Sequence, residues 1–140
     1  MKISWFSNSP FASTGYGNQT KLFVPRLQAL GHEMSITAFY GVEGAVLTYG
    51  GPRGPIPIYP RAHMPYGQDV WSAHANHFGA DVCISLMDAW VFEPKMNPHN
   101  VPWIPWFPVD MEPLPERIRE RVALAYKRIV FSKFGLKVVN

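Results

Sequence analysis

Apolar and polar residues alternate along this chain in short blocks that predict strands and helices in turn. Four apolar runs of strand length lie at residues 2–7, 33–40, 81–87 and 128–132. Each run stops at polar, glycine or proline residues, as strands do. The run at 81–87 is nearly continuous in its apolar character, which predicts a central strand that is covered on both faces.

Three segments between these runs have apolar residues at helical spacing. The first contains Phe23, Leu27 and Leu30 and ends before a glycine, which suits a helix C-terminus. The second runs from a cap at Asp69 to about residue 78. The third follows a proline, and its predicted buried face consists of Ile118, Val122, Ala125 and Tyr126.

Glycine and proline interrupt two further apolar stretches. Between residues 41 and 65, two short apolar pieces flank the sequence GGPRGP, which predicts a small hairpin or a strand with an edge excursion. In the segment 101–109, Pro102, Pro105 and Pro108 lack a backbone donor, so only a short or irregular strand is predicted there.

The order of these elements predicts the α/β class. Strands that alternate with helices favour a Rossmann-like, mainly parallel sheet with helices on both faces. The length of 140 residues fits one domain, residues 1–140, which is long enough to bury a core.

Composition and charge narrow the range of functions. The chain is 47% hydrophobic and 16% charged, as a globular domain is. The net charge of +3 comes largely from the C-terminal stretch and is too sparse for the basic stripe of a nucleic-acid-binding protein, so no nucleic acid partner is favoured. A single cysteine, Cys83, and the lack of a signal peptide or transmembrane segment predict a cytoplasmic protein.

Polar residues directly follow four of the predicted strands. Ligands bind at the carboxyl ends of the strands in such a sheet, so we expect these loops to rim one edge. The candidate catalytic residues are Asp88 and Asp110, because a carboxylate after an apolar strand is costly unless it is solvated in a cleft or hydrogen-bonded. The candidate substrate-binding residues are Gly15, Tyr16, Gly17, Trp90, Ser132 and Lys133.

Each candidate also has a structural interpretation. Two glycines before a helix allow close approach to an anion, but the loop lacks the third glycine of a dinucleotide-binding fingerprint and also suits a plain turn. Asp88 is able to cap local backbone, and Asp110 to start a turn. His74 and His77 lie three residues apart without an evident third ligand, so we predict no metal site and no cofactor.

Six motifs follow one another along nearly the whole chain. They are ISWFSNSPFASTGYGNQT, ALGHEMSITAFYG, IPIYPRAHMPYGQDV, FGADVCISLMDAWVF, VPWIPWFPVD with PLP, and IVFSKFG. In this order they resemble family 4 glycosyltransferases of the GT-B fold, especially a group common in phage and environmental genomes. Each motif alone is loose, and the specificity lies in their order and spacing.

The resemblance implies the N-terminal half of a retaining glycosyltransferase, in which two Rossmann-like domains enclose the active site. The N-terminal domain binds the acceptor and the C-terminal domain the nucleotide-sugar. Gly15 and Gly17 match the glycine loop that approaches acceptor and donor phosphates, Asp88 the acid that ends a central strand, and Asp110 the acid of the PVD segment. The donor-binding domain is absent from this sequence, which implies that transfer needs a C-terminal domain or a partner chain.

Two rival hypotheses come from other classes. One is a stand-alone α/β binding or interaction domain without catalysis, and whether the chain alone is an enzyme is therefore left open. The other, a small nucleotide-binding oxidoreductase module, is disfavoured by the missing fingerprint.

A lobe without its partner domain exposes an apolar flank, which predicts self-association. The sequence predicts neither the donor sugar nor the acceptor.

Overall fold

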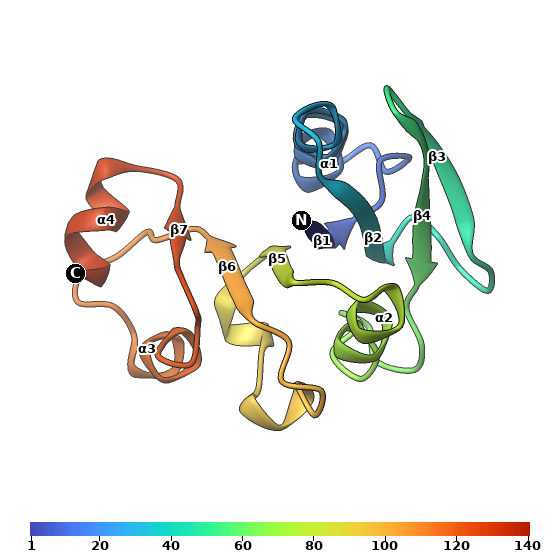
Figure 1. Ribbon diagram of the computed structural model, residues 1–140. Helices are drawn as coiled ribbons and strands as arrows, with labels where there is room; N and C mark the ends of the chain where they lie inside the picture. Colours follow the sequence, from blue (N-terminus) through green and yellow to red (C-terminus); the bar gives the residue numbers. More distant parts are fainter.

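The computed structural model describes residues 1–140, the side chain of Pro94 excepted, and forms one seven-stranded sheet flanked by helices (Figure 1). The strand order is β3-β4-β2-β1-β5-β6-β7. The strands are β1 Lys2–Asn8, β2 Glu33–Tyr40, β3 Leu47–Gly51, β4 Gly54–Pro60, β5 Val82–Leu86, β6 Trp103–Phe107 and β7 Ile129–Val130. The helices are α1 Gly15–Ala29, α2 Trp71–Phe78, α3 Glu116–Val122 and α4 Lys133–Val139, with 3-10 turns η1 Ala89–Val91 and η2 Pro94–Met96.

Six of the seven strands run parallel to one another, and the edge strand β3 pairs antiparallel with β4. Without β3, the strand order is that of a doubly wound Rossmann sheet. Helix α1 packs on one face and α2 on the other (Figure 1). The predicted α/β class with a Rossmann-like, mainly parallel sheet is confirmed. No helix of the described chain is long and apolar enough to cross a membrane.

The central strand β1 supplies both halves of the core. Ile3 and Trp5 pack in the cluster on the α1 side, and Phe6 packs in the cluster on the α2 side. Because successive side chains of a strand point to opposite faces, a strand covered on both sides needs apolar residues at nearly every position. This explains the mostly apolar run that predicted the strand.

The two segments rich in glycine and proline form strands as predicted. Strands β3 and β4 make a hairpin in which Gly51 pairs with Gly54 across a two-residue turn, and β4 adds to the sheet beside β2. Strand β6 tolerates Pro105 because β7 pairs only with Trp106 and Phe107, beyond that proline.

Helices α1 and α2 differ from the prediction in their buried faces and caps. In α1 the buried face contains Thr20, Val24 and Gln28, whereas Leu30 is exposed. Gln28 is buried because its amide donates to the carbonyl of Gly54 and accepts from the backbone of the hairpin turn. In α2 the predicted cap is wrong: the carboxylate of Asp69 accepts from backbone amides of the preceding loop and not from the helix.

The C-terminal region also departs from the predicted pattern. In α3 only Val122 is buried, and Tyr126, predicted to be inside, is exposed. After β7 the chain forms α4, which the sequence pattern did not predict, and Ser132 caps this helix by accepting from the amide of Gly135 at 3.0 Å. The cap gives Ser132 a structural role at the start of α4.

One face of β5 and β6 is less well covered than the sequence predicts. Val82, Ile84, Ile104 and Trp106 alternate with buried neighbours and are only half-buried. Of the helices that the structure describes, none lies over these two strands on the α1 side (Figure 1). The prediction that residues 81–87 are covered on both faces is therefore right for one face and right only in part for the other, where Leu86 is buried but Val82 and Ile84 are half-buried.

We expect the purified chain to associate with a second copy through this half-covered face, because only another copy is present in solution to bury it. Ile104→Lys should shift sedimentation toward the monomer at concentrations where the wild type is dimeric. Leu30→Lys, which changes an exposed leucine at the end of α1, is the control and should leave the wild-type equilibrium unchanged. A wild-type chain that sediments as a monomer at high concentration would contradict the prediction.

Candidate functional site

The candidate site lies at the carboxyl edge of the sheet, where the strand order reverses. Strands β1 and β5 are neighbours, but the chain leaves β1 toward β2 and leaves β5 toward β6. The strand order thus reverses between them, and a crevice opens at such a switch point because the following connections turn away in opposite directions.

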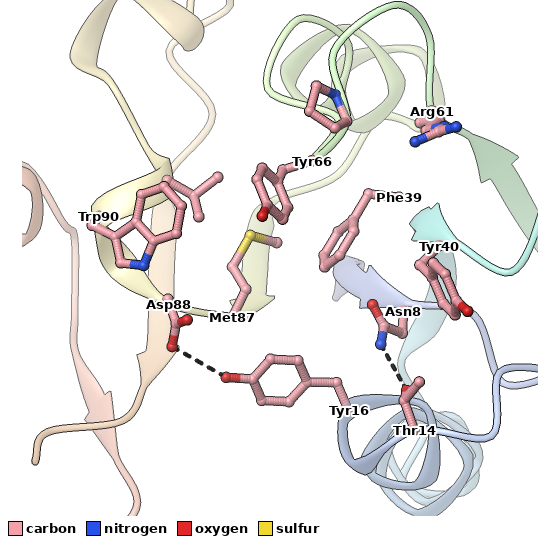
Figure 2. Close-up of a pocket in the computed structure, with 12 residues that line it drawn as sticks. Asn8, Thr14, Tyr16, Phe39, Tyr40, Arg61, Tyr66, Met87, Asp88 and Trp90 are labelled. Carbon is pink, nitrogen blue, oxygen red and sulfur yellow. Dashed lines mark hydrogen bonds between the residues drawn. The ribbon is translucent and has the colours of Figure 1, made fainter.

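A pocket of about 300 Å³ lies at this switch point (Figure 2). Its wall contains residues from the ends of β1, β2, β4 and β5 and from the first turn of α1. Most of the wall is aromatic or apolar, with a few polar groups among the rings, as in small-molecule sites generally. The lining residues that bear on its chemistry are Asn8, Tyr16, Phe39, Arg61, Tyr66, Asp88 and Trp90.

Asn8 and Thr14 join the end of β1 to the start of α1. The pairing of β1 with β2 shifts register between Ser7 and Asn8, and irregularities of this kind redirect side chains at sheet edges. The Asn8 amide Nδ2 donates to Thr14 Oγ1 at 2.7 Å, and the same oxygen accepts from the backbone amide of Gly17 at 2.9 Å. Thr14 therefore caps α1 while holding Asn8 at the pocket wall.

Tyr16 reaches across the pocket toward Asp88. Its hydroxyl donates to Asp88 Oδ1 at 3.5 Å, and the two side chains close one side of the pocket in Figure 2. Burial, followed by the charge of Asp88 and the hydrogen bond to it, raises the pKa of Tyr16 from the ordinary 10.0 to about 12. At neutral pH the phenol is thus a fixed donor aimed at the carboxylate.

A spectrophotometric titration should show one tyrosine that ionises near pH 12 instead of near pH 10. Because the folded chain keeps this proton longer than the unfolded chain does, the stabilisation is complete below pH 10 and is lost as the pH rises toward 12. Tyr16→Phe should remove the late step. Asp88→Asn should lower the pKa of Tyr16 only in part, since burial is the larger cause. Ionisation of Tyr16 near pH 10 would instead show that its phenol is solvated.

A second hollow of about 160 Å³ adjoins the pocket and contains both candidate acids. Asp88 and Trp90 line both spaces, and Asp110 lines the hollow together with the start of η1 and part of α3. The loops after β5 and β6 therefore bring the two carboxylates to the same edge of the sheet, as the parallel topology predicts. Both aspartates are exposed, so both remain hydrated and available to a ligand.

Four of the predicted substrate-binding residues lie elsewhere. Ser132 and Lys133 follow the parallel strand β7 at the same edge of the sheet, but they line a separate hollow and not the pocket that contains Asp88. Gly17 is buried, and a Cβ at this position would overlap the carbonyl oxygen of Ala12. Gly15 is exposed, and a Cβ there would meet no atom within 4 Å. Gly17 thus serves the close packing of the loop on α1, and neither glycine lines the pocket.

Asn8, Phe39, Arg61 and Tyr66 are among the pocket residues that sequence reasoning missed. Asn8 was interpreted only as the end of a strand, although an amide at the carboxyl end of a buried first strand is a signal for a site. Arg61 and Tyr66 follow β4, which the pattern predicted as part of a hairpin, so its loop was not counted among those at the edge.

His74 and Cys83 are held in the packing of the fold and lie outside the pocket. The ring of His74 stacks on Tyr59, and its Nε2 lies 2.9 Å from the carbonyl oxygen of Pro60. Burial lowers the pKa of His74 and raises that of the Cys83 thiol to about 12. Among the described side chains, no three His, Cys, Asp or Glu residues lie close enough to hold a metal ion.

Comparison with protein-family models gives no match, and a search of curated proteins finds no matching sequence. The geometry of the site is thus the basis for assigning a function.

Proposed function

We propose that the chain binds the acceptor of a glycosyl transfer at the carboxyl edge of its sheet, as the acceptor-side lobe of a GT-B glycosyltransferase. The observation that carries this proposal is the pocket at the switch point, with Asp88 in its wall and Asp110 beside it in the adjoining hollow. The order of the six sequence motifs supports the same family.

The groups around the pocket suit the chemistry of an acceptor. Its aromatic and apolar wall can hold the body of a ligand, while an exposed carboxylate can accept the hydrogen bond of a hydroxyl group that attacks a sugar. Tyr16 is neutral and donates to Asp88, so it orients that carboxylate without neutralising it.

The nucleotide-sugar would be bound by a C-terminal domain or by a partner chain. The first turn of α1 lies at the pocket, to which it contributes Tyr16, and Thr14 satisfies the backbone amide of Gly17. A helix N-terminus favours an anion, so a donor phosphate approaching from a second lobe would meet this end of α1. No metal or cofactor is needed in this proposal, which assigns the reaction to the cytoplasm.

The alternative is a stand-alone α/β binding domain that uses the same pocket without catalysis. Transfer of labelled sugar, measured with a donor-binding half encoded downstream of residue 140 or by a neighbouring gene, separates the two. We expect transfer only when both halves are present, because catalysis depends on positioning both reactants. Turnover by the isolated chain would show that the lobe is complete in itself, and binding without transfer in the two-half assembly would favour the alternative.

A further inference from the structure

The side chain of Asn8 leaves one polar atom without a partner at the wall of the pocket. Asn8 is 7% exposed, its Nδ2 donates to Thr14, and its Oδ1 is buried without a hydrogen bond. In Figure 2 this oxygen points away from Thr14 toward the space beside Phe39. An unsatisfied buried acceptor costs about 1–3 kcal/mol, so a ligand that donates an O–H or N–H here recovers that cost.

An arc of aromatic rings forms the wall opposite α1. Phe39 contacts Tyr66 with ring centroids 5.7 Å apart, and Tyr66 contacts Trp90 at 5.8 Å. The rings meet at 70° and 80°, so the arc is curved and offers no pair of parallel rings to sandwich a flat base. Aromatic faces carry partial negative charge and attract polarised C–H groups.

The charges of the pocket favour a neutral ligand. Arg61 is paired with Glu43 at 2.9 Å, and Asp88 is the carboxylate among the described lining residues. An anionic ligand would meet Asp88 and would have to compete with Glu43 for Arg61. Asn8 Oδ1 and the Asp88 carboxylate are hydrogen-bond acceptors, so they favour a ligand that donates hydrogen bonds.

From these observations we infer that the pocket binds a saccharide ring. A pyranose has C–H groups that can lie on the arc of Phe39, Tyr66 and Trp90, and hydroxyl groups around its edge that can donate to Asn8 and Asp88. The volume of about 300 Å³ is at the lower end for small-molecule pockets, which suits one ring with its substituents. Calling this saccharide the acceptor rests on the proposed function.

Hollows on both sides leave room for a larger saccharide. One of about 540 Å³ shares Phe39, Tyr40 and Arg61 with the pocket, and the other shares Asp88 and Trp90. The second hollow also contains Asp110. A ring in the pocket can therefore direct a free hydroxyl toward both carboxylates while the rest of the saccharide extends along the edge.

Titration of the isotope-labelled chain with methyl hexopyranosides that vary the configuration at each ring carbon tests the inference by NMR. We expect at least one to bind with a Kd of about 1–10 mM and to shift the resonances of Asn8, Tyr16 and Trp90. The nucleosides thymidine and cytidine represent a ligand with a flat base, and short alkyl alcohols represent a lipid. Both kinds of compound should bind at least tenfold more weakly than the best glycoside.

Substitutions at Trp90 and Asn8 test whether these residues bind the glycoside or only support the fold. Trp90 is 40% exposed, so Trp90→Ala should weaken glycoside binding about tenfold while the chain remains folded. Tyr126→Ala, which removes an exposed ring outside the pocket, is the matched control and should bind like the wild type. Asn8→Asp, which keeps the size of the side chain, should change the affinity for the glycosides while the chain remains folded.

The inference is overturned if no glycoside of the panel binds at concentrations up to about 100 mM. It is also overturned if a nucleoside or an alcohol shifts the same resonances and binds with higher affinity than every glycoside. The second result would leave an acceptor pocket with another ligand and so preserve the proposed function. Glycoside binding together with a two-half assembly that never transfers sugar would leave the saccharide pocket standing and remove the proposed function.

Discussion

Gly17→Ala is expected to lower the free energy of unfolding by about 3 kcal/mol, and Gly17→Val by more. A Cβ at this position overlaps the carbonyl oxygen of Ala12 and lies 3.0 Å from Thr14 Oγ1. Backbone cannot move aside as the end of a flexible side chain can, so the loop and the first turn of α1 must separate. The Thr14 cap and its bond to Asn8 should be lost in the same step.

Chemical denaturation of the wild type and variants measures this effect. Gly15→Ala is the matched control two residues earlier, where an added Cβ meets nothing within 4 Å. Because alanine restricts the unfolded chain and favours a helix, this control should be neutral or stabilised by up to about 1 kcal/mol. Equal destabilisation by both substitutions would mean that the loop does not pack on α1 as the structure has it.

Asp88→Asn and Asp110→Asn are each expected to reduce sugar transfer by about 100-fold in the assembly with a donor-binding half. An amide retains the shape of the side chain but loses the charge that would accept a proton or stabilise developing positive charge. Both aspartates are exposed, so the unfolding free energy should change by less than about 0.5 kcal/mol.

Initial rates with a labelled nucleotide-sugar provide the measurement, and Glu120→Gln provides the control. Glu120 is exposed on α3, and its substitution removes one negative charge outside the pocket and its hollows. It should transfer at the wild-type rate. Asp88→Asn should also lower the pKa of Tyr16, whereas Asp110→Asn should not, since Asp88 alone bonds to that phenol. If both aspartate variants transferred sugar at the wild-type rate, the two carboxylates would have no role in the proposed site.

The sequence predicts strands and turns correctly where they depend on residue type and spacing within a few positions of the chain. The limits of β2 at 33–40, the hairpin around GGPRGP and the helix stop at Gly79 all follow from residue type and spacing. Gly79 adopts φ 76° at the C-cap of α2, a conformation that glycine tolerates best. The buried faces of α1 and α3 were predicted only in part: Leu27 and Val122 pack on the core, whereas Leu30 and Tyr126 are exposed. Hydrophobic spacing also gave no sign of Gln28, which is buried through hydrogen bonds to the hairpin.

The sequence by itself determined the alternation of strands and helices, and hence the parallel sheet and the edge where Asp88 and Asp110 emerge. Periodicity and turn residues act within a few positions, so they can be read along the chain. Only the tertiary structure decided that Asn8 keeps an unpaired oxygen, that Phe39, Tyr66 and Trp90 form one arc, and that Ser132 lies apart. Whether a polar atom finds a partner, and which rings meet, depends on contacts between residues distant in sequence, which local patterns do not encode.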